Sequence, residues 1–137
     1  MLIQKRGTVK IKWFPKVAST VFELGDAVSF NTLGTITRST SGSTTVAGFI
    51  KRAVTASDTD YASASLVPVQ VVEDNDEIEI DASTTVTAAM IGTLRDLSNS
   101  STLNVGSLFT IGHFRVLGIG STTSKAVVAL TKSAIAQ

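Results

Sequence analysis

The run Leu66-Val67-Pro68-Val69-Gln70-Val71-Val72 and the run Glu77-Ile78-Glu79-Ile80-Asp81 decide the fold class. In each run every second residue is aliphatic, which is the period of a β-strand with two different faces. Asp74-Asn75-Asp76 between them is turn chemistry, so an acidic hairpin turn separates two predicted strands. Pro68 cannot donate a ladder hydrogen bond, which places it at a sheet edge or in the first rungs of its strand.

The rest of the sequence, on both sides of these runs, is also rich in β-branched residues that are separated by frequent turn signals. Short strands with frequent turns predict an all-β fold, either a small β-barrel or a β-sandwich of short antiparallel strands. We expect strands near residues 8–14, 21–30, 33–39, 45–54, 66–73, 77–81, 93–98, 107–119 and 125–132.

Between the strands we expect at most one short helix, at residues 87–92. Thr87 is its predicted cap, and Gly92 is predicted to end it in the left-handed conformation. Residues 55–65 are the predicted long loop, and residues 39–45 a polar hairpin tip. The sequence shows no internal repeat and no interdomain linker.

Length and composition favour one domain with one hydrophobic core, since the chain has 137 residues, 43% of them hydrophobic and 17% charged. We expect residues 1–16 to form a basic N-terminal arm or strand and residues 17–137 a single β domain. The absence of cysteine excludes disulfides, thiolate zinc sites and thiol nucleophiles. A net charge of +1 argues against nucleic-acid binding, and no apolar run is long enough for a membrane span.

Charge is distributed unevenly along the chain. Six of the eleven acidic residues fall within residues 73–81, and the first sixteen positions hold five of the twelve basic ones: Lys5, Arg6, Lys10, Lys12 and Lys16. One interpretation is two solvated faces that keep sheet edges from aggregating. The other is charge complementarity between subunits or toward an acidic partner surface.

No residue pattern indicates catalysis. His113 is the sole histidine, so neither a histidine-containing metal cluster nor a triad spacing is present. The acidic run from Asp74 lacks the glycine and the terminal glutamate of a calcium loop, because Glu79 and Thr85 occupy those positions. We therefore expect no enzyme activity, no catalytic residue, no metal site and no cofactor.

At the N-terminus, Val9, Ile11 and Trp13 alternate with Lys10 and Lys12, which predicts a strand with one buried and one solvated face. Trp13 is in phase with the aliphatic residues. Packing in a core or an interface is therefore favoured over stacking on nucleic-acid bases.

Several segments together resemble the capsid decoration, or cement, proteins of tailed bacteriophages. The resemblance covers most of residues 21–132. It rests on the order and spacing of Leu24-Gly25-Asp26-Ala27-Val28, Val46-Ala47-Gly48-Phe49-Ile50, Leu66-Val67-Pro68-Val69-Gln70-Val71, the acidic strand through Asp81, Ile91-Gly92-Thr93-Leu94-Arg95-Asp96-Leu97, Phe114-Arg115-Val116-Leu117-Gly118 and Ala126-Val127-Val128.

This resemblance implies a virion structural protein that is made in the host cytoplasm and stabilises the outer surface of an expanded icosahedral capsid. The implied partners are the major capsid protein and the protein itself, as a homotrimer, with no membrane and no direct nucleic-acid contact. An N-terminal arm would reach onto the capsid and add a strand to a neighbouring sheet. The predicted contact residues are Lys5, Arg6, Val9, Lys10, Ile11, Lys12, Trp13, Phe14 and Lys16.

Two other classes remain open at this stage. One is a different virion β-domain, from a tail tube, a head-completion protein or a receptor-binding protein. The other is a carbohydrate-binding module, which would need several exposed aromatic side chains as a sugar platform.

Overall fold

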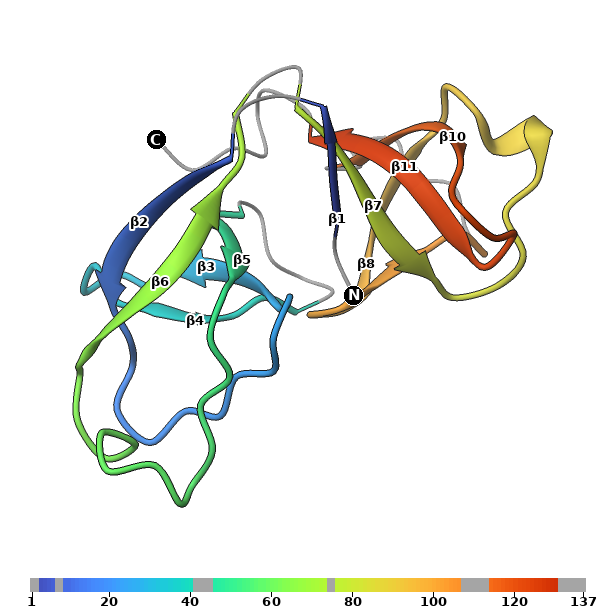
Figure 1. Cartoon of the computed structure of the whole chain (residues 1–137). Coiled ribbons are helices and arrows are strands. Elements are labelled where there is room, and N and C mark those ends of the chain that lie inside the picture. The colour runs from blue at the N-terminus through green and yellow to red at the C-terminus, as the bar shows by residue number, and fades with distance from the viewer. Residues whose placement is uncertain (1–2, 7–8, 41–45, 74–75, 107–113, 131–137) are drawn as a thin grey trace.

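The computed structural model describes residues 3–6, 9–40, 46–73, 76–106 and 114–130. It confirms the all-β prediction: two sheets are each curled into a small barrel, and the described residues include a single 3-10 turn, Ala88–Met90. Figure 1 shows the two barrels side by side. No helix in these residues is long and apolar enough to cross a membrane.

The C-terminal barrel contains the second half of the chain. Its strands follow the order β7-β11-β10-β8-β9, and β9 then pairs in parallel with β7 to close the ring. A further strand, β1 (Ile3–Arg6), pairs with the same edge of β7, next to β9. The strands of the ring are β7 (Glu77–Ala82), β8 (Leu94–Asn99), β9 (Thr102–Asn104), β10 (Phe114–Ile119) and β11 (Lys125–Leu130).

The N-terminal barrel has the strand order β2-β6-β5-β3-β4. Lys16, which directly follows β2, makes a parallel bridge to Ile36 of β4, so this sheet also curls back on itself. Its strands are β2 (Lys10–Pro15), β3 (Ala27–Phe30), β4 (Ile36–Arg38), β5 (Gly48–Ile50) and β6 (Leu66–Val71).

The two barrels repeat one topology. If β2 to β6 are matched in chain order with β7 to β11, every pairing in one barrel has its counterpart in the other, including the parallel closure of the first strand on the third. The registers also agree: Ala27 lies opposite Phe49, and Leu94 lies opposite Arg115 at the matching positions. The sequence shows no internal repeat, so this repeat is one of strand pairing and register.

The turn that enters β3 recurs before β8. Gly25 has φ 89° and donates its N–H to the Ile50 carbonyl at 2.9 Å, while Gly92 has φ 85° and donates to the Val116 carbonyl at 2.7 Å. Glycine adopts this left-handed conformation without a steric cost. The left-handed Gly92 was predicted correctly, but Thr87 makes no side-chain cap hydrogen bond, so its predicted capping role is wrong.

Each barrel has its own apolar core. Buried Ile78, Ile80 and Leu97 belong to the C-terminal core, and buried Val28 and Val69 belong to the N-terminal one. The N-terminal half also contributes to the C-terminal core through Ala27, Val46, Phe49 and Val72. These shared residues pack the barrels against each other. The division into a 1–16 arm and a single 17–137 domain stays a prediction.

Asp26 adds a buried polar connection between the barrels. Its carboxylate accepts the Glu23 N–H at 2.8 Å and the Ser100 hydroxyl at 3.0 Å, and it lies 2.8 Å from Arg38 Nε. The Ser100 carbonyl in turn accepts the Ala27 N–H at 2.7 Å. Because Ser100 follows β8, these bonds fix the entrance to β3 against the C-terminal barrel.

Pro68 lies in an interior strand, because β6 pairs with both β2 and β5. Of its two predicted positions, the sheet edge is wrong, whereas the first rungs of the strand agree with its place as the third residue of β6. The Pro68 carbonyl accepts the Lys51 N–H at 2.9 Å, so its backbone polar side faces β5 just beyond the last residue of that strand, Ile50. The missing proline donor therefore falls where the ladder ends.

Candidate interaction surface

An exposed apolar stripe runs along the N-terminal strand. Ile11 and Trp13 share one face of β2, and Leu66 of β6 lies opposite Pro15 on that same face. Val9 directly precedes the strand and continues its alternation. The exposed fractions of Val9, Ile11, Trp13 and Leu66 are 55%, 43%, 59% and 56%. We call these four residues the apolar stripe. Among the aromatic residues that the structure describes, Trp13 is the one that is largely exposed.

Val9, Ile11 and Trp13 do not form a buried face within this chain, so the prediction of a core position is wrong, whereas their packing in an interface stays a prediction. The opposite face of β2 points into the N-terminal barrel, where Phe14 packs edge-on against Phe30 with ring centroids 5.0 Å apart. Alternation was detected correctly, but the aliphatic phase of this strand faces outward. Val9, Ile11 and Trp13 are each more than 40% exposed, so the described chain leaves much of that face open at β2.

The two lysines of this strand, Lys10 and Lys12, lie on the face of β2 opposite the stripe, and both are exposed. Lys10 Nζ donates to Glu73 Oε1 at 2.6 Å, a contact between two half-exposed side chains. Lys12 is exposed as well. The strand therefore presents apolar groups on one face and positive charge on the other.

The remaining predicted contact residues behave differently. Lys16 is fully buried, and its ammonium donates to the carbonyls of Tyr61 at 2.8 Å and Ser63 at 2.6 Å. Phe14 is half-buried. Neither is available to a partner, so we leave them out of the interaction surface. Lys5 and Arg6 lie in β1, and their side chains fall outside the described part of the chain.

The acidic segment is largely engaged within the protein. Glu79 is buried and accepts both the N–H of Ser121 at 2.8 Å and its hydroxyl at 2.9 Å. Asp76 accepts the Glu73 N–H at 2.9 Å. In addition, the basic strand β1 pairs with the acidic strand β7 along the backbone. The register places Arg6 opposite Glu77, the one pair of opposite charges among the aligned positions of these two strands. Asp74 and Asn75 lie outside the described residues.

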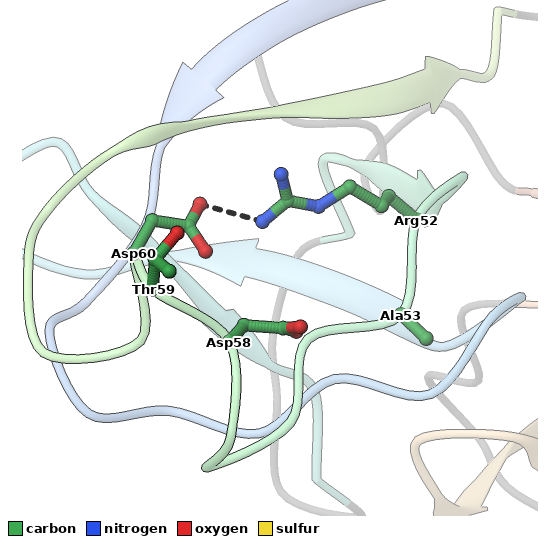
Figure 2. A pocket seen from close by; sticks show the side chains of 5 residues that line it. All are labelled: Arg52, Ala53, Asp58, Thr59 and Asp60. Carbon is green, nitrogen blue, oxygen red and sulfur yellow. Dashed lines mark hydrogen bonds and ion pairs between the residues drawn. The ribbon is translucent and has the colours of Figure 1, made fainter.

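One depression of about 500 Å³ lies on the N-terminal barrel, lined by Arg52, Ala53, Asp58, Thr59 and Asp60 (Figure 2). Arg52 donates to Asp60 at 2.6 Å, and this bond, with a second from Ser65, lowers the pKa of Asp60 below its ordinary value of 3.8. Asp58 accepts the backbone N–H of Thr55 at 2.8 Å. Both carboxylates thus fasten the 55–65 loop.

Thr59 is the one hydroxyl in this lining, and both aspartates beside it already accept hydrogen bonds from the loop or from Arg52. Within the described ranges, no group of three His, Asp or Glu side chains is placed to hold a metal ion. His113 lies outside those ranges. The apolar stripe is therefore the feature from which a function is best argued.

The chain matches no protein-family model, and it matches none of the curated proteins.

Proposed function

We propose that this protein decorates and stabilises the outer surface of an expanded icosahedral phage capsid by bridging major capsid proteins. It would be a virion structural protein, made in the host cytoplasm and assembled as a homotrimer. The observation that carries the proposal is the exposed apolar stripe on the border strand of the N-terminal barrel. The sequence resemblance to phage decoration proteins supplies the partner.

An exposed apolar strip of this kind favours a protein partner. Contiguous apolar patches on a surface mark interaction sites, and tryptophan is among the residues that contribute most to binding energy. Lys10 and Lys12 lie on the other face of β2, and Lys10 is already paired with Glu73. Lys12 is therefore the lysine of this strand that favours an acidic partner surface, because complementary charge speeds encounter and sets orientation. The stripe thus supports assembly better than catalysis.

A capsid is also a partner on which a small contact suffices. A protein that binds the expanded lattice and not the compact one stabilises the expanded form by mass action. Many sites on one shell, or several on one trimer, multiply modest affinities through effective concentration.

Co-sedimentation of the purified protein with undecorated expanded heads tests the proposal, with unexpanded proheads as the control. We expect saturable binding to expanded heads only. Absence of binding to both forms would contradict it and would direct attention to other virion roles. Deletion of residues 1–16 is a poor test, because it would remove β1 from one sheet and β2 from the other. Point substitutions in the stripe preserve these strands.

A further inference from the structure

The repeat reveals a difference between the two barrels at one edge. In the C-terminal barrel, the outer edge of the first strand, β7, pairs with two strands. It pairs with β9 at Asp81 and Ala82, and with β1 at residues 77–79. In the N-terminal barrel, the first strand β2 makes only the β4 bridge, at Lys16. The register matches Ile11 and Trp13 with Glu77 and Glu79. The position that β1 fills on β7 has no counterpart strand on β2 among the described residues.

Within the described ranges, no strand pairs with the outward backbone groups of β2 at that position. Lys16 N–H donates to the Ser65 carbonyl at 3.0 Å, so even-numbered residues of β2 bond to β6. Because antiparallel pairs alternate, the N–H and C=O groups of Ile11 and Trp13 point away from β6. Pro15, which has no N–H, limits this free edge on one side. An edge of this kind is a template for another strand.

The side chains define what such a strand must carry. Residues opposite one another on neighbouring strands share a face, so the incoming residues beside Ile11 and Trp13 must be apolar. The alternate residues would lie beside Lys10 and Lys12 and should be acidic. The protein already contains one such charge pairing with the signs reversed, because the register places Arg6 of β1 opposite Glu77 of β7.

We propose that the free edge of β2 accepts an extended segment of the partner, with alternating apolar and acidic residues, as an added antiparallel β-strand. The edge and its chemistry follow from the repeat. That the segment belongs to a major capsid protein rests on the proposed function. A second β1 strand is a poor occupant, because it has no acidic residue to offer Lys10 and Lys12, and at the register it takes on β7 its Arg6 would lie opposite Ile11.

A peptide titration of the full chain tests the edge without a capsid. The probe is the capped peptide Asp-Glu-Ile-Glu-Ile-Asp-Ala, the sequence of residues 76–82, and the control peptide has lysine at its four acidic positions. By NMR with amide hydrogen exchange, we expect the acidic peptide alone to shift and protect the N–H groups of Ile11 and Trp13. Equal effects of both peptides, or no effect at this edge at millimolar peptide, would overturn the proposal.

Two variants separate backbone pairing from side-chain docking. Ile11→Pro removes an outward N–H that β6 does not use, and Ile11→Ala keeps this N–H while removing most of the side chain. We expect peptide-induced protection to be lost in Ile11→Pro and retained, at weaker affinity, in Ile11→Ala. Equal binding by both variants would refute strand addition. If Ile11→Pro does not fold, N-methylation of alternate peptide nitrogens replaces it: one set must abolish binding and the other must not.

The same variants distinguish this inference from the proposed function. Expanded heads that bind the wild type and Ile11→Pro equally would leave capsid decoration standing and overturn strand addition. Heads that bind neither protein would contradict capsid decoration, and the peptide titration would then decide the edge by itself.

Discussion

Two aspartate–arginine pairs of similar length give a test of how burial sets their contribution to stability. Asp26 lies 2.8 Å from Arg38 and is fully buried, whereas Asp60 lies 2.6 Å from Arg52 in an open depression. Asp26→Ala leaves the Glu23 N–H and the Ser100 hydroxyl without their acceptor as well. Breaking a fully buried pair by removing one partner costs about 3–5 kcal/mol, and the partly exposed Arg38 places Asp26→Ala at the lower end of that range.

A loss of that size should lower the melting temperature by about 10 °C or more, since about 1 kcal/mol corresponds to roughly 4 °C for a domain near this length. Circular dichroism melts of the wild type, Asp26→Ala and Asp60→Ala measure the effect. We expect Asp60→Ala to change the melting temperature far less, because solvent screens an exposed pair. An equal or larger loss from Asp60→Ala would refute the argument from burial.

Three further predictions concern the fold. Gly48→Ala places a Cβ 2.3 Å from the Gln70 carbonyl oxygen, so melts should show a loss of roughly 2 kcal/mol or more, whereas Gly118→Ala meets open space and should be near neutral. Lys16→Met leaves two carbonyls without their ammonium donor, which should cost about 2–4 kcal/mol and speed limited proteolysis of the 55–65 loop. Because the pKa of Asp60 is lowered, its ionised carboxylate stabilises the fold above pH 3.8, and this contribution is lost as the pH falls through the lowered pKa. The difference in melting temperature between the wild type and Asp60→Asn should therefore vanish at a pH below that lowered pKa.

The strands with strong alternation could be predicted from the sequence. Residues 77–81 were predicted as a strand, and β7 spans Glu77–Ala82 with Ile78 and Ile80 buried. The polar phase of this strand was harder to predict, because Glu79 is buried by a turn at Ser121 that is distant in sequence. A local pattern carries no information about which remote turn covers a side chain.

The two short strands β1 and β9 were not predicted. They contain four and three residues, too few for a period of two to be distinguished from chance. Both depend on β7 as a tertiary partner. The contact set was predicted only in part for the same reason: Leu66 joins the apolar stripe through the register of β6 with β2, which no residue pattern specifies.

The repeat could not be recognised from the sequence, because the two barrels share strand pairing and register but not the side chains at matching positions. The register matches Gly48 with Phe114 and Trp13 with Glu79, substitutions that no similarity measure would align. The usable signal was the pair Leu24-Gly25 and Ile91-Gly92, in which each glycine needs a positive φ and each preceding residue is an exposed aliphatic. Such a glycine turn precedes both β3 and β8, which occupy matching positions in the two barrels, and it therefore indicates the repeat.

Binding of stripe variants to purified expanded heads tests the central claim most directly. Trp13→Ala removes an exposed indole of the stripe, and Leu33→Ala is its matched control, an exposed apolar residue in the β3–β4 turn outside the stripe. Burial of the exposed part of a tryptophan contributes about 3 kcal/mol, or roughly 100-fold in Kd. We predict that loss for Trp13→Ala and wild-type affinity for Leu33→Ala. Unchanged binding by Trp13→Ala would contradict the assignment of this surface to the capsid.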